Sequence, residues 1–105
     1  MTRLGRLEPL ALVGLEDAAS AILEGMAAYR FTEYFETEVL RKRPYLKKEW
    51  CVRVVEHPIR SERQEQNRFR FWASVPEFGH KIVRVITLED KVTIHNAFPD
   101  RGFKP

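Results

Sequence analysis

The sequence predicts an α+β domain in which a short strand and two helices precede a four-stranded antiparallel meander. Two observations carry this prediction. Apolar residues recur at helical spacing before Pro58 and at every second position after it. Short turn-forming segments separate the alternating stretches, so consecutive strands are expected to pair as neighbours. The helices are then expected to cover one face of the sheet, and the other face is expected to stay open.

An amphipathic helix is predicted over residues 15–28, within an N-terminal extension of residues 1–28. Its apolar positions are Leu15, Ala18, Ala19, Ile22, Leu23 and Met26. Glu16 and Asp17 lie where the helix dipole favours negative charge. This helix is expected to pack on its own domain. Alternatively, it docks a partner or joins two copies into a homo-oligomer.

A short β-prone segment, residues 29–31, opens the single domain predicted for residues 29–105. Thr32 follows and offers its hydroxyl as a helix cap. A helix is predicted from residue 33 to about residue 42, because the chain carries a helical pattern there and Pro44 stops it.

A second helix is predicted over about residues 46–57. Trp50 and Val54 are four positions apart on its apolar stripe, and Pro58 ends it. Cys51 lies beside that stripe and is expected to be a packed thiol rather than a nucleophile. As the sole cysteine, it excludes an internal disulfide and a cysteine-based zinc site.

Four strands are predicted after Pro58. They cover residues 59–65, 68–75, 80–88 and 92–98. The first is polar and typical of an edge strand, whereas the third is apolar on both faces and typical of a central one. The turns are expected at Gln66-Asn67, at Pro76 to Gly79 and at Glu89 to Lys91.

Alternation within the second and fourth strands predicts which side chains share a face. In the second strand one face holds Phe69, Phe71, Ala73 and Val75, and the other holds Arg68, Arg70, Trp72 and Ser74. In the fourth strand one face is expected to hold Val92, Ile94, Asn96 and Phe98, and the other Thr93, His95 and Ala97.

Positive charge is concentrated in the middle of the chain. The 105 residues include 18 Lys and Arg against 15 Asp and Glu, which gives a formal net charge of +3. Residues 41–84 hold 12 basic and 5 acidic residues, whereas residues 1–28 hold 2 and 4. With 44% hydrophobic and 31% charged residues, the composition is that of a globular protein. A basic central block favours polyanionic partners.

Export and membrane insertion are not expected. The longest apolar run, residues 10–15, is far too short to cross a bilayer. Arg3, Arg6 and the Ala19-Ser20-Ala21 triplet faintly resemble a signal peptide, but acidic residues flank the short apolar stretch. We therefore expect a cytoplasmic protein. The three histidines lack metal-ligand spacing, so neither a metal site nor a cofactor is expected.

The open sheet face is the main candidate site. Arg70 and Arg84 are the residues expected to hold a phosphate, because guanidinium groups pair with phosphate oxygens. Trp72 offers a plane on which a base can stack, with Arg68 beside it. His95 titrates near neutrality and is the candidate proton-transfer group. The alternative is a solvated sheet face, although Arg84 within an apolar strand needs a partner or a ligand.

Two further groups of cations are candidate contacts to a nucleic-acid backbone. One lies between the predicted helices and comprises Arg41, Lys42, Arg43, Lys47 and Lys48. The other lies in the tail and comprises Arg101 and Lys104. For the first group, the alternative is that these cations only face solvent at the junction between the helices. For the tail, the alternatives are pairing of Asp100 and packing of Phe103 onto the core.

The layout resembles the small toxins of the RelE/ParE superfamily, nearest its BrnT-like and DUF4258-like branch. The resemblance is carried by Phe31-Thr32-Glu33 in the short strand and by the stretch from Val52 to Pro58 that leads into the meander. It covers about residues 29–98. Membership would imply an endoribonuclease that inhibits translation and is neutralised by a cognate antitoxin. It would place Arg70, Trp72, Arg84 and His95 on the concave sheet face.

Two functions are therefore expected from the sequence. The first is a toxin-like endoribonuclease that cleaves RNA, either free or at the ribosome, without a metal ion. The second is a non-catalytic module that binds nucleic acid or an acidic protein segment through the same face and uses the N-terminal helix for a partner.

Overall fold

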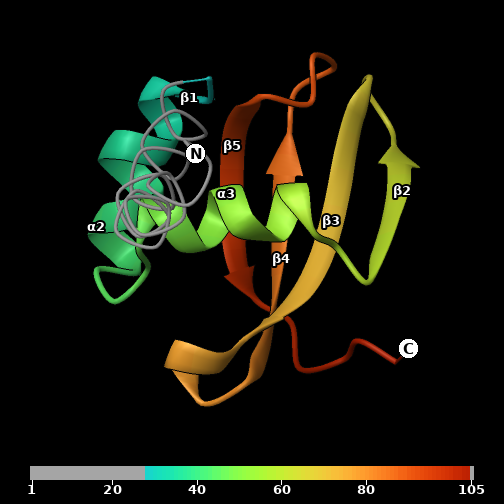
Figure 1. Ribbon diagram of the computed structural model, residues 1–105. Coiled ribbons are helices and arrows are strands. Elements are labelled where there is room, and N and C mark those ends of the chain that lie inside the picture. The colour runs from blue at the N-terminus through green and yellow to red at the C-terminus, as the bar shows by residue number, and fades with distance from the viewer. Residues whose placement is uncertain (1–27, 105) are drawn as a thin grey trace, which may run out of the picture.

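The structure, a computed structural model, describes residues 28–104. The N-terminal helix predicted for residues 15–28 lies, except for its last residue, outside this part of the chain. The described residues form an α+β fold with a five-stranded mixed sheet in the order β1-β5-β4-β3-β2 (Figure 1). The strands are β1 (Arg30–Phe31), β2 (Arg60–Gln64), β3 (Arg68–Val75), β4 (Lys81–Thr87) and β5 (Thr93–Pro99).

The antiparallel meander predicted for the second half of the chain is confirmed as β2 to β5. Gln66 and Asn67, at the β2–β3 turn, both adopt positive φ angles of 64° and 58°, which favours a tight hairpin. The short β1 then adds to the meander in parallel, beside β5. The sheet is therefore mixed rather than purely antiparallel.

The first helical segment runs from residue 33 to residue 42, as predicted, but its middle is a π-helix. This segment, η1 (Phe35–Val39), leads directly into α2 (Leu40–Lys42). Thr32 caps it as expected, because its hydroxyl accepts the backbone N–H of Phe35 at 3.1 Å. Phe35 and Val39 lie one turn apart and are both fully buried.

The second helix, α3 (Lys48–Glu56), begins two residues later than predicted and ends before Pro58. It crosses one face of β3, β4 and β5 (Figure 1). Its buried side chains meet those of Phe71, Val83 and Val85 in the main core. Cys51 is buried there, as predicted, and burial raises the pKa of its thiol to about 12, so it stays protonated at neutral pH.

The face assignment predicted for β5 is wrong. Ile94 and Ala97, expected on opposite faces, are both fully buried in the core under α3. The cause is a β-bulge: Ile86 of β4 pairs with Asn96 whereas Thr87 pairs with Ile94, so His95 is an extra residue. The bulge reverses the alternation in the second half of β5 and turns Asn96 and Phe98 toward the side of the sheet opposite α3.

Candidate nucleic-acid interface

The sheet side opposite α3, called here the outer face, carries the residues expected to form the site. Across β2, β3, β4 and β5 the register aligns Arg60, Trp72, Arg84 and Phe98 in one row. The next row holds Glu62, Arg70, Ile86 and Asn96. Adjacent strands in a sheet are about 5 Å apart, so the side chains of one row are direct neighbours.

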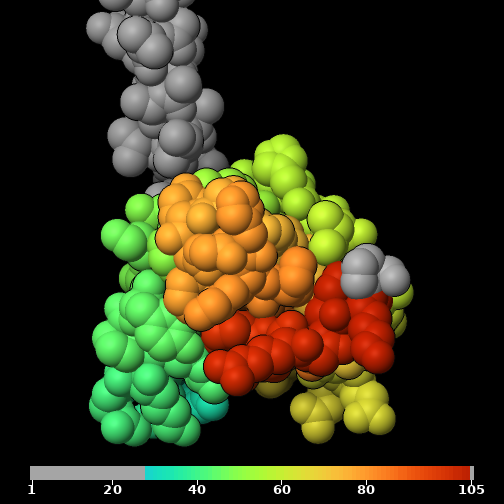
Figure 2. All heavy atoms as spheres, turned by 90° about the horizontal axis from the view of Figure 1, so that it is seen from below, coloured from blue at the N-terminus to red at the C-terminus, as the bar shows by residue number. Residues whose placement is uncertain are grey.

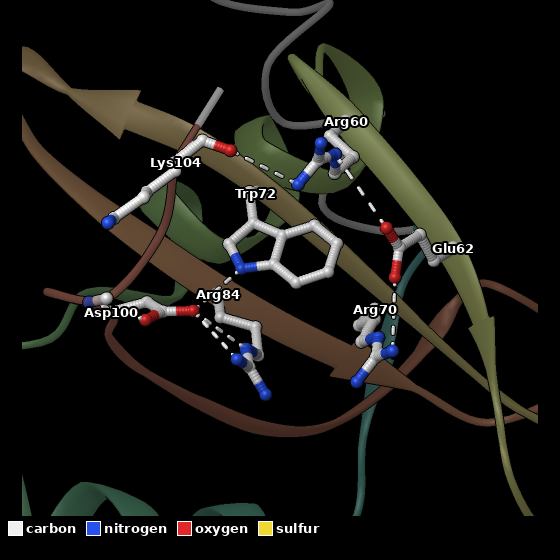
Figure 3. Close-up of polar contacts among 8 residues, drawn as sticks. Arg60, Glu62, Arg70, Trp72, Arg84, Asp100 and Lys104 are labelled. Atoms are coloured by element: carbon white, nitrogen blue, oxygen red, sulfur yellow. Dashed lines mark hydrogen bonds and ion pairs between the residues drawn. The ribbon is translucent and has the colours of Figure 1, made fainter.

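Arg84 has an internal partner that accounts for its charge within an apolar strand. The Asp100 carboxylate accepts hydrogen bonds from Arg84 at 2.8 and 3.1 Å and from the indole N–H of Trp72 at 2.8 Å (Figure 3). The indole hydrogen bond, followed by Arg84, holds the pKa of Asp100 below its usual value. Pairing of Asp100 is the alternative that the sequence also allowed. It uses the donors of Arg84 that were expected to hold a phosphate.

The chain after β5 covers part of the outer face, which therefore is not fully open as expected. Residues 100–104, the C-terminal segment, run across the lower end of the sheet toward β2 (Figure 2). The Phe103 ring lies 5.4 Å from that of Trp72, and Arg60 donates a hydrogen bond to the backbone oxygen of Lys104 at 3.3 Å. Trp72 is thus only 4% exposed, and its indole is not free to stack on a base in this arrangement.

Arginine and aromatic side chains alternate along this row. Phe98 lies between the guanidinium groups of Arg43 and Arg84, at 5.7 and 5.1 Å from its centroid. Trp72 in turn lies 5.2 Å from Arg84 and 5.5 Å from Arg70. Such contacts hold guanidinium groups in place over aromatic rings. The structure therefore brings Arg70, Trp72 and Arg84 together, as expected, and adds Arg43, which sequence analysis had placed in the helix junction.

Arg70 is incompletely paired. One of its terminal nitrogens lies 3.0 Å from Glu62, but its buried Nε has no hydrogen-bond partner among the described residues. Arg68, two residues before Arg70 on the same face of β3, makes no ion pair within residues 28–104. Arg68 is therefore the arginine of the outer face that no carboxylate neutralises among the described residues, and Arg70 shares Glu62 with Arg60.

His95 belongs to a different cluster from Arg84. Its ring nitrogen Nδ1 lies 3.0 Å from the Thr32 hydroxyl, and its ring stacks on that of Tyr34 at 4.9 Å. Burial, followed by the positive charge of Arg68, lowers the pKa of His95, so the ring is neutral at pH 7. Arg84 is aligned with Phe98, three residues farther along β5. The His95–Arg84 pair expected from the sequence is thus not brought together, whereas Arg68 is within electrostatic range of His95.

The cations at the helix junction divide into paired and unpaired groups. Arg41 pairs with Glu38 and Lys48 with Glu36, each at 2.8 Å. Lys42 and Lys47 are exposed and make no ion pair within the described part of the chain. Two of the five cations in this group are therefore neutralised locally.

Two hollows flank the C-terminal segment. The smaller, of about 460 Å³, lies on the outer face between Arg60, Arg70, Arg84 and Lys104. The larger, of about 990 Å³, lies on the other side of the segment against Tyr45 and Phe78, with Arg101 on its wall. The two tail cations predicted as contacts thus line different hollows.

Sequence analysis missed the site roles of Glu62, Tyr34 and Phe98. Tyr34 precedes the buried Phe35 in a helix and carries no signal of its own. Phe98 was placed on one face of β5 with Ile94, and only the bulge separates them. A usable signal existed for Asp100, because the Pro-Asp-Arg-Gly sequence favours a turn that folds the chain back. Its carboxylate indeed accepts the Gly102 N–H at 3.1 Å.

Comparisons of the chain with models of protein families, with curated proteins and with solved structures gave no match. Within residues 28–104, no three side chains of His, Cys, Asp or Glu are grouped in a way that could hold a metal ion. None of the helices in that same range is long and apolar enough to cross a membrane.

Proposed function

We propose that the protein is a nucleic-acid interaction module that binds single-stranded RNA across the outer face of its sheet. The observation that carries this proposal is the charge of that face. Its strand positions hold four arginines, Arg60, Arg68, Arg70 and Arg84, against two carboxylates, Glu62 in β2 and Asp100 directly after β5. An excess of guanidinium groups on one side of a sheet attracts a phosphate backbone.

The accessible part of the interface lies at the upper end of β3. Arg68, which makes no ion pair within residues 28–104, and the exposed part of the Arg70 guanidinium, whose side chain is 32% exposed, supply donors for phosphate oxygens. Tyr34, which is 42% exposed and held against His95, supplies an aromatic plane at the same end of the sheet. Alternation of cations and aromatic planes suits single-stranded RNA, whose unpaired bases can stack on side chains.

Replacing Arg68 with glutamine is expected to weaken binding of a fluorescently labelled oligouridine about threefold to tenfold at low salt. The loss of one phosphate contact should also reduce the slope of log K against log salt by about 0.7. Both quantities can be measured by fluorescence anisotropy across a salt series.

Arg53→Gln is the matched control, because Arg53 lies on α3 and is paired with Glu77, on the side away from the outer face. An equal loss in both variants would mean that the chain attracts RNA by overall charge alone. Absence of any binding by the wild type at low salt would refute the proposed function itself.

A toxin-like endoribonuclease, neutralised by a cognate antitoxin, is the second candidate. One observation favours it: the neutral His95 ring, fixed by Thr32 and Tyr34, is a suitable acceptor for a 2′-hydroxyl proton. Arg68, whose positive charge acts on His95, is the candidate for stabilising charge on the reacting phosphate, a role assigned from the sequence to Arg84.

If this second candidate holds, expression in bacteria arrests growth and the purified protein cleaves RNA without added metal. His95→Ala is then expected to remove both effects, while His57→Ala, at the exposed end of α3, retains them. The measurements are growth after induction and electrophoresis of a labelled RNA, with circular dichroism to show that each variant is folded. RNA that stays intact while bound by the wild type supports the interaction module instead.

A further inference from the structure

The C-terminal segment presents to the outer face the two chemical groups of a nucleotide. Asp100 places one carboxylate oxygen between the indole N–H of Trp72 and the guanidinium of Arg84 (Figure 3). Phe103 places an aromatic ring against Trp72, with Arg60 5.2 Å from its centroid. An anion bound by an arginine and a planar ring stacked on a tryptophan are also how a phosphate and a base are held.

We propose that Trp72, Arg84 and Arg60 form a nucleotide subsite of the RNA interface, which the chain's own Asp100 and Phe103 occupy in the closed form. This inference rests on the proposed RNA binding and extends it. It assigns one stacked base to Trp72 and one phosphate to Arg84. Without the segment, these would be the largest aromatic surface and the most central cation of the outer face.

The contacts that hold the end of the segment are few, so a ligand can displace it. The Asp100 backbone N–H is anchored to Ile82 at 2.9 Å. Beyond it, Arg101, Gly102 and Lys104 are exposed. The contacts of these last residues to the sheet are the 3.3 Å bond from Arg60 and the Phe103 ring, which lies against Trp72 and Arg60. The hollow of about 460 Å³ next to Trp72 gives a base room to approach. Lifting Phe103 therefore uncovers the indole while β5 stays paired, and the phosphate of the ligand then displaces the Asp100 carboxylate from Arg84.

Phe103→Ala tests the subsite without changing the charge. We expect this variant to bind an oligoadenosine about threefold to tenfold more tightly than the wild type, because a site that is closed most of the time binds with its affinity reduced by the open fraction. The affinity for inorganic polyphosphate, which has charge but no bases, should increase less in this variant. Adding Arg84→Gln to Phe103→Ala is expected to cancel most of the gain.

Nuclear magnetic resonance supplies a direct readout. The indole N–H signal of Trp72 should shift when oligoadenosine is added, whereas that of Trp50, a buried residue of α3 on the other side of the sheet, should not. The subsite is refuted if a folded Phe103→Ala binds the oligonucleotide no better than the wild type, or if the Trp72 signal does not respond. Loss of all RNA binding in the wild type instead refutes the proposed function, so the two failures are distinguishable.

Discussion

Replacing Asp100 with alanine is expected to lower the free energy of unfolding by about 2–3 kcal/mol. The change leaves the Arg84 guanidinium and the Trp72 indole N–H without their acceptor, in side chains that are mostly buried. Breaking a fully buried ion pair costs about 3–5 kcal/mol, and the 27% exposure of the Arg84 side chain reduces that cost because water reaches the orphaned charge. Urea denaturation followed by circular dichroism measures the loss.

Two controls separate this ionic network from ordinary surface pairs. Glu77→Ala breaks the paired hydrogen bonds with Arg53 on exposed side chains, so it should cost much less unfolding free energy than Asp100→Ala. Combining Asp100→Ala with Arg84→Met removes the unpaired charge and should restore part of the loss. Equal costs for Asp100→Ala and Glu77→Ala would contradict the central role assigned to Asp100.

The same carboxylate has an expected pH signature. The pKa of Asp100 is lower in the folded chain than in the unfolded chain, because Trp72 and Arg84 favour its charged form. Its contribution is therefore complete at pH values above the unfolded pKa, near 4, and disappears as the pH falls through the folded pKa. The stability difference between the wild type and Asp100→Asn should shrink over that acidic range.

Local patterns were sufficient to predict most of the fold. The limits of β3 are those expected from the alternation of arginine with Phe69, Phe71 and Ala73. Thr32 and Pro58 marked the start of one helix and the end of the other, because capping and the missing proline N–H act within a few residues. These features depend on short-range chemistry, which a single sequence displays directly.

The bulge at His95 and the parallel pairing of β1 depend on contacts between distant residues. Phe31 pairs with Ile94, and Thr32 meets His95 across 63 positions of the chain. Nothing in the alternation of residues 92–98 reveals the extra residue, since a bulge is stabilised by what lies beside the strand. The sequence therefore indicated a strand here but assigned half of its side chains to the wrong face.

The composition of the candidate site was predictable, and its internal pairing was not. Alternation alone places Arg68, Arg70 and Trp72 on one face. That Arg84 needs a partner also follows from its apolar neighbours in β4. Whether the partner is a ligand or Asp100 depends on where the chain turns after β5, which is a tertiary property. Because Asp100 pairs with Arg84 in the closed form, Arg68 and Arg70 are the cations expected to meet a ligand first.

Phe35→Ala is the substitution expected to cost most, about 3–5 kcal/mol of unfolding free energy, because it removes a fully buried ring and leaves a cavity. The ring packs 5.1 Å from that of Phe31, so it also joins the π-helical segment to the β1 edge of the sheet. Thr32 bonds the backbone of Phe35 rather than its ring. In molecules that remain folded, the cap and the position of His95 should therefore survive.

Phe35→Leu and Tyr34→Ala complete this test in urea denaturation. Leucine keeps most of the buried volume and should cost about 1–2 kcal/mol, since volume-conserving exchanges are tolerated better than truncations. Tyr34 is 42% exposed, so its loss should cost less than about 1 kcal/mol, while removing the ring that stacks on His95. Tyr34→Ala should thus weaken RNA binding while the protein keeps nearly its full stability. Phe35→Ala should instead lower the stability while the molecules that remain folded still bind RNA. If Phe35→Ala costs no more than Tyr34→Ala, the helix that carries both residues does not pack as described.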